Sequence, residues 1–317
     1  MKAEEDRAFA MAPPPQHGDM ILVTGATGRT GRHIVKSLLD LGFKVRVMSR
    51  SATRAREMLA ADGIAADVVE ITEGDVADRA AVAQALKPSA EGAKVSRLIF
   101  AAGGDKAVYR DVNGLAPQLF AEEGAQQDLA QVILVSAAWV TRPWSATSLI
   151  INTAFADVPM GWHLRGEDAL RRSSRIDFVI VRAGRIVDDG PKARGVKIGQ
   201  GDRFSFMEGG QPGMCPVTLA ETCVQSLLLG SGMRATIEVI GDSRGTDCCT
   251  PKFDWKELFS KLEPERTWVE RAEDPCVTHK RAAASFKRGC VICAVATVGV
   301  ITALVVLAVT LSSTKAP

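Results

Sequence analysis

Residues 20–31, MILVTGATGRTG, decide how this chain folds. The mostly apolar run MILVT predicts a buried strand, and glycines follow it at positions 25, 28 and 31. Gly25 permits a tight turn, Gly28 lets the backbone approach a pyrophosphate, and Gly31 allows a helix to pack closely on the sheet. The helical pattern HIVKSLLDLG comes next, so its N-terminal N–H groups would face the phosphates. A glycine turn between a strand and a helix predicts dinucleotide binding, and a turn that serves only chain geometry is the alternative.

The chain beyond this turn alternates between strand-like and helix-like segments. Such alternation predicts right-handed βαβ units, and hence an α/β fold with a doubly wound parallel sheet of the Rossmann type. After Arg182 the pattern loosens, and the glycine-rich segment 188–214 predicts a small irregular substrate region. Helices are then expected in 217–230 and 254–264. The further expected strands are 44–48, 67–71, 97–102, 131–137, 177–182 and, late in the chain, 236–242.

Composition sets bounds on the class of protein. The 317 residues are 46% hydrophobic and 24% charged, the balance of a folded domain that needs no disulfides. The net charge of +2 gives no reason to expect nucleic-acid binding. The seven cysteines are odd in number and scattered, and the four histidines form no ligand cluster, so neither a disulfide framework nor a metal site is expected.

The C-terminal segment 290–311, CVICAVATVGVITALVVLAVTL, contains no charged residue. At about 1.5 Å per residue it would extend roughly 33 Å, enough to cross a hydrocarbon core of about 30 Å. Four basic residues lie between 280 and 288, against only Lys315 after the segment, so the positive-inside bias places the large domain in the cytosol. We therefore expect a single-pass, tail-anchored membrane protein; a buried central helix is the alternative. The endoplasmic reticulum, the outer mitochondrial membrane and the plastid envelope all suit such a span.

These segments divide the chain into parts. The N-terminal end has several acidic residues and no apolar stretch of the kind that a secretory signal needs. The expected parts are a disordered tail (1–19), an NAD(P)-binding Rossmann domain (20–265), a charged linker (266–289), a transmembrane helix (290–311) and a short tail (312–317).

The end of the second expected strand bears on which dinucleotide is bound. An NAD site usually places a carboxylate there for the ribose 2′-hydroxyl, whereas VRVMSRSATR offers Arg50. A guanidinium suits a 2′-phosphate, so NADP(H) is favoured over NAD(H). Arg29, within the glycine turn, is a candidate for the same pocket, and Thr27 and Thr30 complete the expected phosphate-binding turn. A solvated loop residue is the alternative for Arg50.

The sequence resembles the atypical short-chain dehydrogenases/reductases with NAD(P)H-binding, NmrA-like domains. The resemblance runs from about residue 20 to about residue 264 and is carried by GATGRTG (25–31), EGDVAD (73–78), AAGG (101–104), VNG (112–114), the ED-AL pattern at 167–170 and IDFVIVRAGRI (176–186). It implies that Asp75 and Val76 border the adenine. It also implies that Ala101, Ala102 and Gly103 line the nicotinamide ribose.

Active reductases of this kind use a Tyr that donates a proton and a Lys four residues later. The resemblance aligns Pro159 and His163 with these positions, and the chain has a single tyrosine, Tyr109, in another segment. The Tyr–Lys dyad is therefore missing.

Three residues are candidates to replace the dyad. His163 is a candidate ribose contact or proton donor, or else a packing residue. Ser136 is a candidate to polarise a carbonyl, or else a strand-end hydroxyl bonded to the backbone. Tyr109 is a candidate to reach the site from its own loop.

Two functions remain open. The first is an NADP(H)-dependent oxidoreductase that acts on a hydrophobic carbonyl or enone near a membrane. The second is a non-catalytic NADP(H)-binding redox sensor or scaffold, with a protein as its partner.

Overall fold

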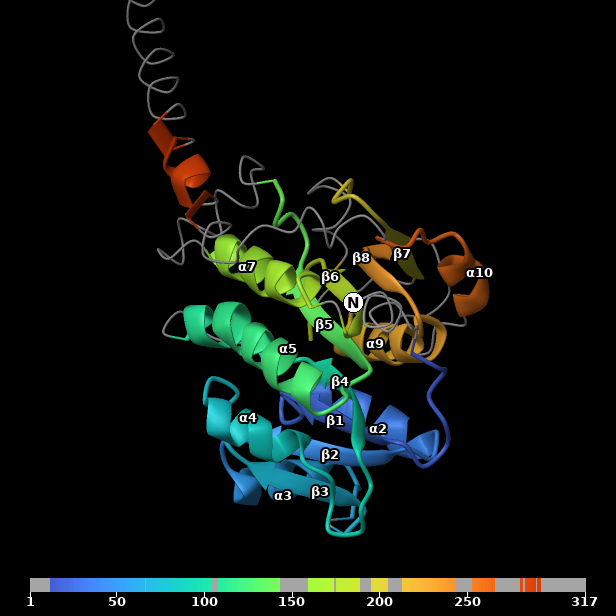
Figure 1. The fold of residues 1–317 in the computed structure, drawn as a ribbon. Coiled ribbons are helices and arrows are strands. Elements are labelled where there is room, and N and C mark those ends of the chain that lie inside the picture. The colour runs from blue at the N-terminus through green and yellow to red at the C-terminus, as the bar shows by residue number, and fades with distance from the viewer. Residues whose placement is uncertain are drawn as a thin grey trace, which may run out of the picture.

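The computed structural model describes residues 12–65, 67–103, 108–142, 159–173, 175–188, 195–204, 213–242, 253–265, 280–281, 283–288 and 290–291. Its centre is an eight-stranded sheet in the order β3-β2-β1-β4-β5-β6-β8-β7 (Figure 1). Every neighbouring pair runs parallel except β7 and β8, which are antiparallel. The strands are β1 (Met20–Thr24), β2 (Lys44–Ser49), β3 (Val69–Glu73), β4 (Val95–Phe100), β5 (Gln131–Ala137), β6 (Asp177–Ala183), β7 (Gly195–Gly199) and β8 (Arg234–Asp242).

Helices cover both faces of this sheet, as the predicted doubly wound fold requires (Figure 1). One face carries α2, α3, α9 and α10, and the other carries α4, α5 and α7. A short π-helix, η1, leads directly into α5. The bounds are α2 (Gly31–Asp40), α3 (Ala52–Ala61), α4 (Arg79–Leu86), η1 (Arg110–Leu115), α5 (Ala116–Gln126), α7 (Pro159–Arg171), α9 (Pro216–Leu229) and α10 (Trp255–Ser260).

Strand β1 shows how the sequence specifies these two layers. Ile21 and Val23 belong to the core under α2 and α9, whereas Met20 and Leu22 belong to the core under α4 and α5. All four side chains are buried, because successive residues of a strand point to opposite faces and both faces are covered. A nearly continuous apolar run therefore marks a central parallel strand.

The strand order reverses between β1 and β4. From β1 the chain moves outward through β2 and β3, then returns to β4 on the other side of β1. The connections that leave these two strands diverge, and they open a crevice at the carboxyl ends of the strands. The predicted glycine turn follows β1, so the fold places it at this switch point.

The N-terminal segment differs from its prediction as a disordered tail. Residues 12–19 lie against the amino ends of the strands, where the backbone N–H of Ala12 donates to Asp177 Oδ2 at 2.6 Å. The Arg97 guanidinium, 2% exposed, pairs with Asp19 at 2.7 Å and also donates to the carbonyl of Pro13. A buried cation needs such partners, and residues 12–19, the leader, supply them. Residues 1–11 lie outside the described residues.

The region after β6 is more regular than expected. Strand β7 falls inside the segment predicted to be irregular and pairs with β8 at the edge of the sheet. Strand β3 begins two residues later than predicted, and β4 begins two residues earlier.

The helical residues near the C-terminus are 280–281, 283–288 and 290–291. Within the described part of the chain, no helix combines the length and the apolar character needed to cross a membrane. The predicted span at 290–311 lies outside the described residues from position 292 onward.

Candidate functional site

The glycine turn brings the ends of β1 and β4 into contact. Gly25 has φ +68°, and a Cβ on it would lie 2.4 Å from the carbonyl oxygen of Ala101. Both the left-handed backbone and the close approach therefore require glycine. The backbone N–H of Ala101 donates to the carbonyl of Thr24 at 3.3 Å and holds the two strand ends together.

The same turn seats the start of α2. The N–H of Gly28 donates to the carbonyl of Gly25 at 2.9 Å, and a Cβ on Gly31 would lie only 2.1 Å from that oxygen. The N-cap residue, Thr30, makes no side-chain capping bond, while Thr27 is partly buried and Gly28 is exposed. The turn thus presents backbone and a helix N-terminus to the crevice, where both favour a phosphate.

Arg29 has a partner on the far side of the crevice. Its Nη1 lies 2.8 Å from Oδ2 of Asp188, which follows β6, and both side chains are about half exposed. The predicted contribution of Arg29 to a 2′-phosphate pocket would require it to leave this ion pair.

Two charged residues, Arg50 and Glu73, lie at the carboxyl ends of β2 and β3. Arg50 is exposed and follows β2 directly. Glu73, at the end of β3, stands beside it in register with Ser49, and its Oε2 accepts from the N–H of Ala52 at 2.8 Å. The sequence prediction considered only the end of β2 and so missed this carboxylate, which the parallel register would have indicated.

The residues implied to border the adenine follow β3 at the same edge. Asp75 is exposed, and its Oδ1 accepts from the N–H of Ala77 at 2.9 Å. Val76 is 9% exposed and packs in the core beside α4. Beyond β4, Ala101 and Ala102 are partly buried, and Gly103 is exposed.

Ser136, near the end of β5, has its hydroxyl engaged. It donates to Oε1 of Glu167 on α7 at 2.6 Å, and Ser136 is 5% exposed. The same carboxylate accepts from Arg182 of β6 at 2.6 Å and from Arg171 at 3.1 Å. Burial raises the pKa of Glu167, but Arg182 and Arg171 outweigh that effect and lower the pKa to about 2.

This ionic cluster continues toward β8. Arg171 also pairs with Asp168 at 2.8 Å and with Glu265 at 3.2 Å. Asp202 accepts backbone N–H bonds from Trp139 at 2.7 Å and Thr141 at 2.9 Å, so it fixes the turn after β5. The cluster therefore joins α7, β6 and the loops at the carboxyl edge of the sheet into one polar unit.

His163 lies on α7 one turn before Glu167. Its ring is partly buried, and the loss of water around it lowers its pKa to about 4, against a weaker opposite effect of Glu167. At neutral pH the imidazole is therefore uncharged, unlike the lysine whose aligned position it occupies. Its ring centroid lies 6.4 Å from that of Tyr109, with an angle of 64° between the rings.

Tyr109 precedes the π-helix η1, which α7 crosses closely. A Cβ on Gly166 would lie 2.3 Å from the carbonyl oxygen of Asn113, and one on Gly114 would lie 2.7 Å from the Trp162 ring. Asn113 is 5% exposed, and its Nδ2 has no hydrogen-bond partner in the described part of the chain. Helices of this type recur at functional sites, and this one was not predicted.

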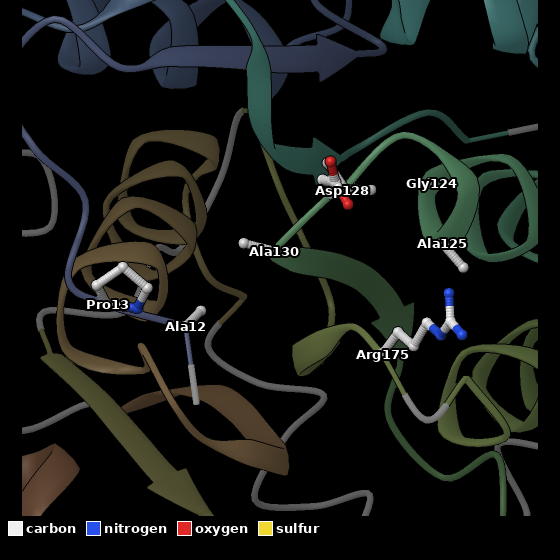
Figure 2. Close-up of a pocket in the computed structure, with 8 residues that line it drawn as sticks. Ala12, Pro13, Gly124, Ala125, Asp128, Ala130 and Arg175 are labelled. Atoms are coloured by element: carbon white, nitrogen blue, oxygen red, sulfur yellow. The ribbon is translucent and has the colours of Figure 1, made fainter. Parts of the chain in front are cut away.

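A hollow of about 300 Å³ opens at the other edge of the sheet, before β5 (Figure 2). Arg175 and the N-terminal segment at Ala12 and Pro13 line it, together with residues of the turn from α5 into β5. It lies at the amino ends of the strands, so it is separate from the crevice at Gly25 and Ala101.

The doubly wound sheet and the glycine turn at its switch point define an NAD(P)-binding Rossmann protein of the atypical short-chain dehydrogenase/reductase type. A family model described as NAD(P)H-binding matches residues 25–227, and the chain belongs to that family.

The chain is also similar to individual proteins and shares its fold with solved structures. The chloroplastic protein At2g37660 of Arabidopsis thaliana is 26% identical over 263 residues, which cover 76% of this chain and 75% of that protein. The divinyl chlorophyllide a 8-vinyl-reductase of Zea mays is 33% identical over 133 residues, which cover 41% of this chain and 33% of the enzyme. A wide-type short-chain dehydrogenase/reductase from Veillonella parvula, solved with NADP, shares the fold with a TM-score of 0.52 and 16% identity over 74% of this chain and 99% of that one.

Proposed function

We propose that this protein is an NADP(H)-dependent oxidoreductase that acts on a hydrophobic carbonyl or enone compound at a membrane surface. The observation that carries the proposal is the contact between Gly25 and Ala101 at the switch point. At the switch point of such a sheet, the backbone N–H groups that open the next helix are where dinucleotide phosphates bind, and this supports a site along the start of α2.

The preference for NADP(H) rests on Arg50. A 2′-phosphate gains a charge-assisted hydrogen bond from this guanidinium, whereas a 2′-hydroxyl gains less. Isothermal titration of the full chain with NADPH and with NADH measures both affinities. Arg50→Glu should weaken NADPH binding far more than NADH binding, and Arg56→Glu, on the exposed side of α3, is the matched control. Equal losses for both nucleotides would remove the case for 2′-phosphate recognition.

The reduction of a carbonyl or enone is the chemistry that we expect. The name of the maize relative, which matches part of this chain, describes a reductase of a vinyl group. Oxidation of NADPH, followed at 340 nm with a panel of apolar aldehydes, ketones and enones, tests this reaction in the full chain.

A non-catalytic NADP(H) sensor is the second candidate function. Two observations favour it: the Ser136 hydroxyl is bonded to Glu167, and an uncharged imidazole stands at the position of the family's lysine. Tight NADPH binding with no oxidation across the panel would support the sensor and contradict the enzyme.

Membrane anchorage by residues 290–311 is part of the proposal. An uncharged segment of this length and the basic residues before it support insertion with the Rossmann domain in the cytosol. A fluorescent tag at the N-terminus, compared with and without residues 290–317, tests the anchor. An unchanged distribution after the deletion would contradict it.

A further inference from the structure

Tyr109 and His163 approach each other although they are 54 positions apart along the chain. Tyr109 precedes η1, shortly after the strand that ends at Phe100, and His163 lies on α7. The edge of one ring faces the other at a centroid distance of 6.4 Å. A phenol and an imidazole can both act as general acids or bases.

Close packing of α7 on η1 produces this approach. Gly166 and Gly114 are the two contact points, because a side chain at either would collide with the opposite helix. His163 is three residues before Gly166, so it lies on the same side of α7 as this contact. The approach of the two rings therefore follows from the packing of α7 on η1.

The same face of α7 connects the two rings to the end of β5. One turn after His163, Glu167 accepts the hydroxyl of Ser136, which places α7 over the carboxyl edge of the sheet. Tyr109 comes from the connection after β4, whose end meets the glycine turn. Both rings therefore belong to elements that border the switch-point crevice.

Among the described residues of the two elements that carry the rings, the charged groups include Arg165 and Glu167 on α7 and Arg110 and Asp111 on η1. Glu167 acts on His163 through space, and Arg171 and Arg182 neutralise that carboxylate. On the η1 side, Arg110 and Asp111 pair with each other at 3.7 Å. An uncharged imidazole places no positive charge beside the phenol, and the protonated phenol is the form that an acid catalyst requires.

We propose that Tyr109 and His163 form a proton-transfer pair that takes the place of the absent tyrosine–lysine dyad, with Tyr109 as the acid for a carbonyl substrate. The proposal rests on the proposed function. The reduced nicotinamide supplies a hydride to the carbonyl carbon, and the Tyr109 hydroxyl gives its proton to the carbonyl oxygen. The products are an alcohol, the oxidised nucleotide and a phenolate. His163 donates an N–H hydrogen bond to that phenolate and gives it this proton while its other ring nitrogen takes up a proton from the solvent, so that each turnover consumes one solvent proton.

The single tyrosine makes the test direct, since absorbance at 295 nm reports the ionisation of Tyr109 alone. The first arm uses the full chain in mild detergent without nucleotide. Because an imidazole N–H stabilises the phenolate, His163→Phe should raise the midpoint of the Tyr109 titration by about half a pH unit or more. His163→Gln keeps an N–H donor and should restore a midpoint near the original. His17→Phe, at an exposed histidine on the other edge of the sheet, should change nothing.

The second arm compares the complexes with NADP⁺ and NADPH at saturation. The oxidised nicotinamide ring carries a positive charge that the reduced ring lacks. If Tyr109 lies beside it, the midpoint should be about half a unit or more lower with NADP⁺, the effect of a unit charge at ~6 Å even in water. Far-UV circular dichroism over the same pH range verifies that the fold persists.

The possible results distinguish a failure of the Tyr109–His163 pair from a failure of nucleotide binding. An unchanged midpoint in His163→Phe overturns the pair, whatever the nucleotide does. Saturable binding of both nucleotides with identical midpoints also overturns it, while NADP(H) binding stands. The absence of any nucleotide binding overturns the proposed function and, with it, the role of the pair.

Discussion

The hydroxyl of Ser136 donates a hydrogen bond of 2.6 Å to the carboxylate of Glu167, thirty-one positions further along the chain. Both residues are buried, and the acceptor is charged. Hydrogen bonds to charged groups are stronger than neutral ones. This bond fixes the end of β5 to α7.

Removing the Ser136 hydroxyl should reduce the stability of the fold and leave nucleotide binding unchanged. Ser136→Ala is expected to lower the free energy of unfolding by about 1.5–3 kcal/mol, the range for hydrogen bonds to charged groups. Chemical denaturation measures this change, and calorimetry with NADPH should show an unchanged Kd. Ser226→Ala is the matched control, because the buried Ser226 hydroxyl has no hydrogen-bond partner in the described part of the chain. Unchanged stability together with lost turnover would instead place Ser136 in the chemistry.

Glu167 should make the protein sensitive to acid. Its pKa falls from the usual 4.5 to about 2 in the folded protein, so its contribution to stability is complete above pH 4.5 and is lost as the pH falls toward 2. Glu167→Gln removes the nearest anion of the buried Arg182, whose next carboxylate, that of Asp202, lies at 3.9 Å, at a cost of about 3–5 kcal/mol at neutral pH. Unfolding curves between pH 7 and pH 3 should show a shallower decline for the variant. Parallel declines would contradict the ion pair as the source of the acid sensitivity.

Substitutions of Gly25 and Gly63 should distinguish the cost of backbone strain from the cost of a steric collision. Gly63 has a similar positive φ, +77°, and a Cβ on it would meet nothing within 4 Å, so Gly63→Ala should cost only the strain of a left-handed residue, about 1–2 kcal/mol. Gly25→Ala adds a collision with Ala101 and should also weaken NADPH binding by more than about tenfold, a change of about 1.4 kcal/mol. Thermal melts and calorimetry measure both effects. Equal behaviour of the two variants would argue against a nucleotide site at this turn.

Glu73 should oppose the binding of a 2′-phosphate. Its carboxylate lies at the start of α3, and its register partner Ser49 directly precedes Arg50, so Glu73→Gln should raise the affinity for NADPH by about threefold to tenfold and leave NADH nearly unchanged. The amide retains an acceptor for the Ala52 N–H. Glu57→Gln, on the exposed side of α3, controls for net charge. A weaker NADH complex in Glu73→Gln would indicate that Glu73 binds a ribose hydroxyl.

Local pattern was sufficient to predict most of the sheet. The apolar runs at β1, β2, β5 and β6 are buried on both faces, and such strands have a strong signal that does not depend on their neighbours. Strand β7 was missed because GVKIG is short and partly exposed and exists through its pairing with β8, which is distant in the sequence.

The candidate site was predictable only in part. The glycine positions follow from backbone geometry, and the structure gives Gly25 and Gly31 the close approaches expected of them. The bond between Ser136 and Glu167 and the approach of Tyr109 to His163 depend on how α7 packs. Such contacts between distant elements cannot be predicted from the spacing of residues along the sequence.

The leader at residues 12–19 contributes to stability at the amino edge of the sheet, whereas the candidate nucleotide site lies at the opposite, carboxyl edge. Arg97 and Asp177 hold it at the amino ends of the strands, far from the crevice at Gly25. Cleavage between Pro13 and Asp19 would take the carbonyl of Pro13 away from the buried Arg97 guanidinium, whereas Asp19 would stay attached to β1, and the cut protein would bind ligand normally until it unfolded. The lifetime of the protein in a cell would then depend on protease access to this leader, independently of the chemistry at the opposite edge.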